Sequence, residues 1–229
     1  MIGITEQGDA ALNHGWVRWV EAGKPAVLIT KTPLALVASL RETMNVIVHC
    51  SITGQGGTVI EPQSPSPDKA LLGLQRLVAL IGVERVVLRV DPIFCTEKAL
   101  KKALAIIETV HAAYPSMRVR VSFLDLYPHV KVRLTNAGLP MPQESFHAPL
   151  AWRRDALARI NAIVTAEVCG EPGIVSTGCI SAIDAAIFGV TLNGTTGSQR
   201  KDCSCAAEKV ELLNERRPCV HACLYCYWK

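Results

Sequence analysis

Residues 85–123, RVVLRVDPIFCTEKALKKALAIIETVHAAYPSMRVRVSF, contain the alternation that decides the fold. Two apolar runs, Arg85–Val90 and Arg118–Phe123, predict buried strands. Between them, apolar residues recur every three or four positions over Lys98–Ala112, which predicts an amphipathic helix. The apolar stripe consists of Leu100, Ala103, Leu104, Ile107 and Val110. A strand, a helix and a second strand in this order predict a parallel β-α-β unit.

The same alternation extends over most of the chain. We expect further strands at Ile2–Thr5, Ala26–Thr30, Val46–Ser51 and Val164–Cys169, and further helices at Asp68–Ile81 and Arg153–Ile163. About six such repeats predict an α/β fold, and we expect a partial (β/α)6 TIM-like barrel. A doubly wound sheet has the same periodicity and is the alternative. Both architectures place the ligand site at the carboxyl ends of the strands.

The composition indicates a folded globular protein. Hydrophobic residues make up 49% and charged residues 19% of the 229 residues, which excludes an intrinsically disordered chain. The net charge of +4 is too small to indicate nucleic-acid binding by itself. No apolar run is long enough to cross a bilayer, and the first residues lack the pattern of a signal peptide. We therefore expect a cytoplasmic protein without a membrane partner.

The nine cysteines are distributed unevenly. Cys50 and Cys95 stand apart, and we assign them to packing. The others are Cys169, Cys179, Cys203, Cys205, Cys219, Cys223 and Cys226. In a reducing compartment this concentration indicates metal ligands or buried thiols rather than disulfides. We expect an α/β barrel over residues 1–190 and a cysteine-rich tail over residues 191–229, together forming one structural domain.

Residues 219–226, CVHACLYC, have the spacing C-x3-C-x2-C with an aromatic residue, Tyr225, before the last cysteine. Three thiolates so closely spaced can hold three irons of a cubane 4Fe–4S cluster and leave the fourth iron without a protein ligand. A structural zinc site is the alternative, with Cys223 and Cys226 completed by Cys203 and Cys205. His221 is either a further zinc ligand or a solvated or hydrogen-bonding loop residue.

The motif resembles that of the radical S-adenosylmethionine enzymes. This resemblance implies that S-adenosylmethionine chelates the open iron through its amino and carboxylate groups. It also implies that the reduced cluster cleaves the cofactor to a 5′-deoxyadenosyl radical, which removes hydrogen from a substrate. A reductase such as flavodoxin or ferredoxin would supply the electron. In those enzymes the motif follows the first strand, so here the tail must fold back over the barrel mouth.

The sequence is also similar to the domain-of-unknown-function family eighteen forty-eight. The segments that carry the resemblance are Thr30-Lys31-Thr32-Pro33, Ile60-Glu61-Pro62, residues 89–93, residues 122–127, Cys169-Gly170-Glu171, Gly178-Cys179-Ile180, Gln199-Arg200, Cys203-Ser204-Cys205 and residues 219–227. The first 25 residues match poorly. The resemblance implies a small partial α/β barrel with a C-terminal radical-type cluster, and it supplies no substrate.

Four further cysteines form a second set: Cys169, Cys179, Cys203 and Cys205. Four thiolates could hold a second, fully ligated 4Fe–4S cluster that acts as an electron relay or a substrate anchor. The alternatives are a buried thiol at a strand end for Cys169, a helix-start cysteine for Cys179, and a zinc knuckle for the remaining pair.

Polar residues collect at the predicted strand ends. The candidates for catalysis are Arg89, Asp91, Asp125 and Glu167, and those for cofactor binding are Lys31, Arg89, Asp125 and Tyr225. Lys31 or Arg89 suits a carboxylate, whereas the acidic side chains suit ribose hydroxyls or an amino group. Tyr127 and Tyr225 could stack near the adenine. An ordinary ion pair is the alternative for Arg89 and Asp91.

Two functions follow as hypotheses. The first is a radical S-adenosylmethionine enzyme that acts on a small molecule or a modified nucleobase, with an unidentified substrate. The second is a zinc-stabilised α/β module that binds nucleic acid without catalysis. The bases that would serve the second function are Arg200, Lys201, Arg216 and Arg217. Acidic residues between them dilute this patch.

Overall fold

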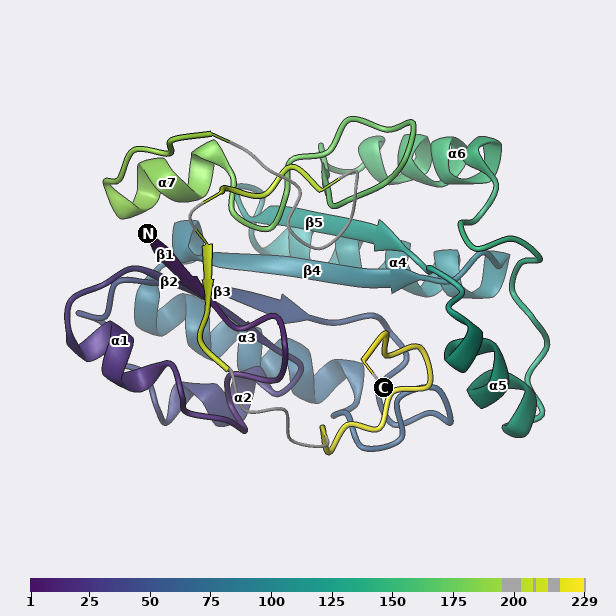
Figure 1. Ribbon diagram of the computed structural model, residues 1–229, viewed down its shortest axis with the longest axis horizontal. Helices are drawn as coiled ribbons and strands as arrows, with labels where there is room; N and C mark the ends of the chain where they lie inside the picture. The colour runs from purple at the N-terminus through teal and green to yellow at the C-terminus, as the bar shows by residue number, and fades with distance from the viewer. Residues whose placement is uncertain (195–202, 208, 214–218, 229) are drawn as a thin grey trace.

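A computed structural model describes residues 1–194, 203–207, 209–213 and 219–228. Seven strands form one curled sheet in which every pairing is parallel, and the order across the sheet is β6-β5-β4-β3-β2-β1-β7 (Figure 1). The strands are β1 (Ile2–Ile4), β2 (Ala26–Thr30), β3 (Val46–Ser51), β4 (Val86–Ile93), β5 (Arg118–Phe123), β6 (Glu167–Val168) and β7 (Lys209–Glu211).

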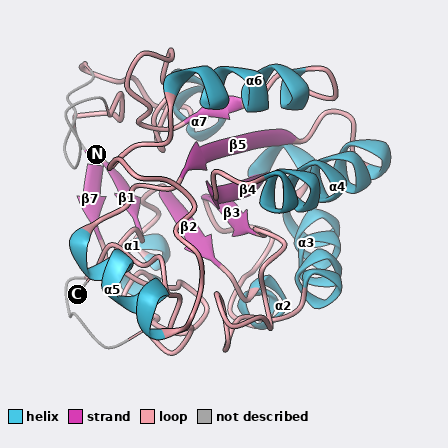
Figure 2. Cartoon of the chain, turned by 90° about the vertical axis from the view of Figure 1, so that its right-hand side faces the viewer, coloured by secondary structure: helices cyan, strands magenta, loops and turns pink. Residues whose placement is uncertain are grey.

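Helices pack against the outside of this sheet (Figure 2). On this outer face lie α1 (Val17–Glu21), α2 (Pro33–Val37), α3 (Pro67–Ile81), the short 3-10 helix η1 (Val83–Arg85), α4 (Glu97–Ala113) and α6 (Leu150–Asn161). The short helix α7 (Ala182–Phe188) packs on the opposite face with Val27 and Ile47, and α5 (Pro128–Asn136) packs at the carboxyl ends of the strands with Phe94 and Leu124. The apolar stripes of α3 and α4 lie in the main core, where Leu77 and Ile107 are fully buried with Val48 and Leu88 of the sheet. Burial of these stripes holds the strands in place.

The strand order distinguishes between the two predicted architectures. From β1 to β6, each strand lies beside the next strand in the chain. A doubly wound sheet would instead reverse direction at a central switch point. The α/β prediction is confirmed, and the sheet is a curled half-barrel rather than a doubly wound sheet.

Three predicted strands, Ala26–Thr30, Val46–Ser51 and Arg118–Phe123, are confirmed with the same bounds. The prediction for Val164–Cys169 was too long, because the structure has a strand only over Glu167–Val168. The amide of Val164 donates to the oxygen of Ile160. Val164 therefore continues the hydrogen bonding at the C-terminal end of α6 and does not begin the strand.

The tail contributes to the sheet. Its strand β7 pairs with β1, with Val210 opposite Gly3. Farther along, residues 219–228 return to the carboxyl ends of the strands, where they lie next to α5 and the loop after β3 (Figure 1, yellow). None of the helices in the described part of the chain is both long and apolar enough to cross a bilayer.

Candidate functional site

A cavity of about 830 Å³ lies at the carboxyl ends of the strands. A volume of this size suits a small-molecule ligand or cofactor. Five of the predicted polar site residues line it: Lys31, Arg89, Asp91, Asp125 and Tyr225. Six cysteines line it as well: Cys169, Cys179, Cys203, Cys219, Cys223 and Cys226. Residues from both ends of the chain therefore share one cavity.

Glu167 is placed differently from the other candidates, because it is not among the residues that line the cavity. Its carboxylate pairs with Arg118 at 2.6 Å and with Arg120, and both arginines also pair with Asp184. Arg120 and Asp184 are fully buried. Glu167 thus belongs to a buried ion-pair network between β5, β6 and α7, which supports a structural role.

Specific contacts hold the cysteine loop, residues 219–226, against the barrel. The amide of Leu224 donates to the oxygen of Ile60 at 3.0 Å. Arg133 of α5 donates from Nη1 to the oxygen of Cys226 at 2.7 Å and from Nη2 to the oxygen of Trp228 at 3.2 Å. These bonds fix the loop between the chain after β3 and helix α5.

Tyr225 anchors the same loop from within. Its ring contacts Phe94 edge-to-face at 5.8 Å between centroids, and its hydroxyl donates to Glu61. Lys31 pairs with the same carboxylate, with its Nζ atom 3.1 Å from Oε1 of Glu61 and 5.3 Å from the Tyr225 ring centroid. Burial alone would lower the pKa of Lys31, but the charge of Glu61, the hydrogen bond to it and other nearby acidic groups together outweigh burial and raise the pKa. Lys31 is therefore a protonated group on the cavity wall.

The three cysteines of the loop differ in exposure, since Cys219 is exposed and Cys223 is buried. Burial raises the pKa of Cys223 to about 11, and it also raises the pKa of Cys219. These groups are therefore neutral thiols in the metal-free protein, and a metal would have to displace their protons.

The spread of the three sulfur atoms bears on the kind of metal. Among the described residues, one set of three potential metal ligands has all its donor atoms within 4.8 Å of one another. It consists of Glu6, Cys179 and Cys205. The sulfur atoms of Cys219, Cys223 and Cys226 are thus not gathered around one point. In this arrangement the three donors do not form a site for a single ion, which needs all of its ligands around one point.

A buried pair, Asp9 and His221, joins the cysteine loop to the cavity wall near β2. Oδ2 of Asp9 is 2.7 Å from Nε2 of His221, and the hydroxyl of Thr30 donates to Oδ1 at 2.6 Å. Burial would raise the pKa of Asp9, but hydrogen bonds from His221 and Thr30 lower it overall. The loop histidine is hydrogen-bonded rather than solvated. Asp9 was not among the predicted site residues, because it lies in a turn and 212 positions from its partner.

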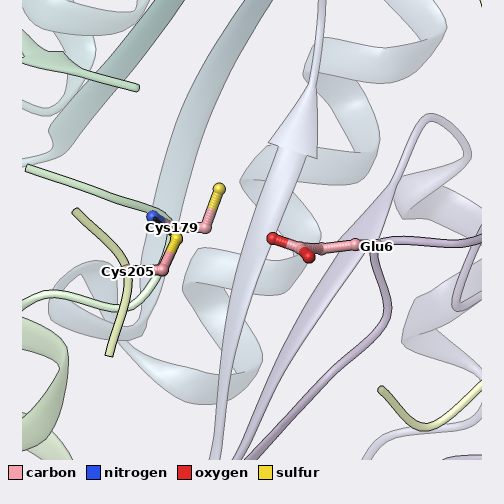
Figure 3. Close-up of side chains that lie close together, drawn as sticks. All are labelled: Glu6, Cys179 and Cys205. Atoms are coloured by element: carbon pink, nitrogen blue, oxygen red, sulfur yellow. Dashed lines mark hydrogen bonds between the residues drawn. The ribbon is translucent and has the colours of Figure 1, made fainter. Parts of the chain in front are cut away.

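Three members of the second cysteine set, Cys169, Cys179 and Cys203, also line the cavity, and Cys205 is fully buried behind them. The sulfur atoms of Cys169 and Cys179 are 3.3 Å apart, and the amide of Cys179 donates to the sulfur of Cys205 at 3.0 Å. Hydrogen bonds from Cys169 and Cys205, together with the charge of Arg89, lower the pKa of Cys179 well below its usual value. Figure 3 shows the Glu6 carboxylate pointing toward the sulfur atoms of Cys179 and Cys205.

The remaining polar candidates have protein partners at the cavity. Nε of Arg89 donates to Asp91 at 2.7 Å, so the ion pair considered from the sequence is present. Asp125 lies 2.7 Å from Nδ1 of His147. Tyr127 stacks on His129 at 5.6 Å. Arg200, Lys201, Arg216 and Arg217, the bases of the nucleic-acid hypothesis, lie outside the described residues.

Comparisons with known proteins identify a family but no activity. No curated protein matches the chain. Among solved structures, a UDP-N-acetylglucosamine 4-epimerase from Bacillus cereus matches 73% of this chain and 77% of its own, at 10% identity and a TM-score of 0.30. A likeness this low supports no argument about fold or function. The family model described as a domain of unknown function, DUF1848, matches residues 19–228. The chain therefore belongs to the DUF1848 family.

Proposed function

We propose that this protein is a radical S-adenosylmethionine enzyme built on a partial TIM-like barrel, with a 4Fe–4S cluster held by Cys219, Cys223 and Cys226. The observation that supports this most is the position of the cysteine loop. The loop forms one wall of the 830 Å³ cavity, and the carboxyl ends of the strands form the others. Ligands of parallel α/β proteins bind at these strand ends.

Such a cluster, when bound, supplies the electron that cleaves S-adenosylmethionine to methionine and a 5′-deoxyadenosyl radical. The protein must then bind and orient the cofactor and keep water out. Lys31 suits the methionine carboxylate, because an ammonium has three donors and, among the described residues, one of them is used on Glu61. Asp125, Asp91 and Arg89 lie on the same cavity walls and suit the polar groups of the cofactor or the substrate.

The substrate is a small molecule or a modified nucleobase that fits beside the cofactor in this cavity. A reductase of the flavodoxin or ferredoxin type supplies the electron. Cys219 and Val220 are exposed, with Val220 exposed to 62%, so this side of the cysteine loop offers the reductase a short approach to the cluster.

The test is anaerobic purification and reconstitution of the full chain. Iron and sulfide analysis and electron paramagnetic resonance of the reduced protein follow, with and without S-adenosylmethionine. We expect a reduced cubane signal that shifts when S-adenosylmethionine is added. Cys223→Ala removes the signal, whereas Cys95→Ala, which changes a cysteine outside both sets, retains it.

A colourless protein that binds only zinc, even after reconstitution with iron and sulfide, contradicts the proposal. In that case the nucleic-acid hypothesis predicts binding to DNA or RNA that weakens steeply with salt.

A further inference from the structure

We propose that a second metal site lies across the cavity from the cysteine loop, where Cys169, Cys179, Cys205 and Glu6 bind a single zinc ion. This site goes beyond the proposed radical chemistry, and its ligands are separate from those of the proposed cluster. It also differs from the second 4Fe–4S cluster that the cysteine count alone would allow.

The distances between the donor atoms favour a single ion. One donor atom each from Glu6, Cys179 and Cys205 lies within 4.8 Å of the others. The sulfur of Cys169 lies 3.3 Å from that of Cys179 but not within 4.8 Å of all three donors, so its side chain would have to turn toward the ion to become the fourth ligand. Zinc–sulfur bonds of about 2.3 Å place neighbouring donors of a tetrahedral site roughly 3.8 Å apart. Cysteines that bind different irons of a cubane are held farther apart, because each iron stands out from the cluster centre.

The fold brings these donors together from four separate segments. Glu6 follows β1 and Cys205 precedes β7. Lys209, the first residue of β7, lies 2.7 Å from Oε2 of Glu6, and Figure 3 shows Glu6 and Cys205 close together. Cys169 follows β6, and Cys179 lies just before helix α7. No segment supplies more than one donor, so the site depends on the completed sheet.

Gly178 allows the backbones at the site to approach closely. Its φ of +72° lies in the left-handed region, and a Cβ at this position would be 2.6 Å from the amide nitrogen of Cys205. Any side chain at residue 178 would therefore push the segment with Cys205 away from Cys179. This close backbone packing fixes the distance between the thiols of Cys179 and Cys205, as a metal site requires.

The surroundings suit an anionic donor set. Nη1 of Arg89 donates to the sulfur of Cys179 at 3.2 Å, and Lys209 lies 2.7 Å from Oε2 of Glu6. Oxygen and thiolate donors of this kind are common zinc ligands. Glu6, Cys169 and Cys179 line the cavity, whereas Cys205 is fully buried behind them. The ion would thus lie on the wall that a substrate must contact.

The test uses the full-length chain with Cys219, Cys223 and Cys226 all changed to Ser, which removes the ligands of the proposed first cluster. After anaerobic purification and dialysis against a mild chelator, we expect about one zinc ion per chain by elemental analysis. Replacement of zinc by cobalt should give the absorption bands of tetrahedral, thiolate-bound cobalt. Adding Cys179→Ala abolishes both readouts, and adding Cys95→Ala leaves both unchanged.

Two further variants test the ligand set. Glu6→Gln should weaken the zinc affinity more than about tenfold in a competition with a chromophoric chelator. Cys203→Ala should not, because Cys203 is assigned no bond to the ion. The reverse result, with loss in Cys203→Ala and none in Glu6→Gln, contradicts the proposed ligands.

Two other outcomes would overturn the proposal. Binding of about four irons and four sulfides by the Ser variant would identify a second cubane. A metal-free chain lighter by two hydrogens, with the bond assigned by peptide mapping to Cys169 and Cys179, would identify a disulfide in place of the metal site. The first cluster is measured separately, by electron paramagnetic resonance of the unmodified chain, so a failure of either proposal is recognised independently of the other.

Discussion

Nη1 of Arg89 donates a hydrogen bond to the sulfur of Cys179 at 3.2 Å, which ties the end of β4 to the second cysteine set. The same guanidinium pairs through Nε with Asp91 at 2.7 Å. The side chains of Arg89 and Asp91 are exposed by only 11% and 17%. One largely buried cation therefore balances a carboxylate and a thiol with a strongly lowered pKa.

We expect Arg89→Gln to lower the free energy of unfolding by about 3 kcal/mol, because it removes the cation that pairs with the largely buried carboxylate of Asp91. The double variant Arg89→Gln/Asp91→Asn should recover part of this loss. Urea denaturation under anaerobic conditions measures both effects. Arg41→Gln is the control, since its ion pair with Glu21 is exposed and should contribute less than about 1 kcal/mol. If the losses of unfolding free energy in the two single variants simply added up in the double variant, Arg89 and Asp91 would not stabilise each other.

Gly178→Ala should weaken metal binding at the second site, because the added Cβ meets the backbone of residues 204 and 205 at 2.6 Å. Gly138→Ala is a matched control. Gly138 has a similar φ of +68°, and no atom of the described residues lies within 4 Å of the position of a Cβ. The control therefore loses only the left-handed preference of glycine, roughly 1 kcal/mol. Zinc content and melting temperature are the readouts, and equal effects in the two variants would exclude the close approach as the cause.

Ala222 adopts a φ of +51° in the turn between Cys219 and Cys223. A β-branched residue strongly disfavours this conformation, whereas glycine adopts it without steric cost. We expect Ala222→Val to reduce the iron content after reconstitution severalfold and Ala222→Gly to preserve it. Val175→Ala is the control. It changes a side chain that is 87% exposed and should leave the iron content unchanged. Full iron content in Ala222→Val would mean that this turn is not needed for the cluster.

Asp184 should stabilise the fold in a pH-dependent manner. Burial would raise its pKa, but the charge of Arg120 and the hydrogen bond from Arg118 outweigh burial and lower it from 3.8 to about 2. The carboxylate thus contributes about 2 kcal/mol at neutral pH, which is present above pH 3.8 and lost as the pH falls toward 2.

Asp184→Asn should therefore lower the unfolding free energy by about 2 kcal/mol at pH 7, and the difference from the unmodified chain should shrink between pH 4 and pH 2. Urea denaturation across this range measures it. Asp155→Asn, at a side chain that is 66% exposed, should have little effect. A difference that does not change with pH would show that the charge of Asp184 is not the source of the stability.

The sequence by itself determined the α/β class, three strands with their exact bounds, and the cysteine motif. These features are local, because the spacing of the apolar residues within a segment is enough to predict whether that segment is a strand or a helix. The sequence also placed Lys31, Arg89, Asp91 and Asp125 at strand ends, and all four line the cavity. That prediction succeeded because the carboxyl ends of parallel strands share one edge of a sheet.

Only the tertiary structure decided which side chains meet. Asp9 and His221 are 212 positions apart, and one carboxylate oxygen of Glu6 lies within 4.8 Å of the sulfur of Cys205 from the far end of the chain. Glu167, on a strand that the sequence also indicated, pairs with Arg118 and Arg120 instead of facing the cavity. Such contacts follow from sheet register and chain return over long separations. The apolar periodicity of a single strand or helix does not predict these contacts, because it indicates only which face of that element is buried.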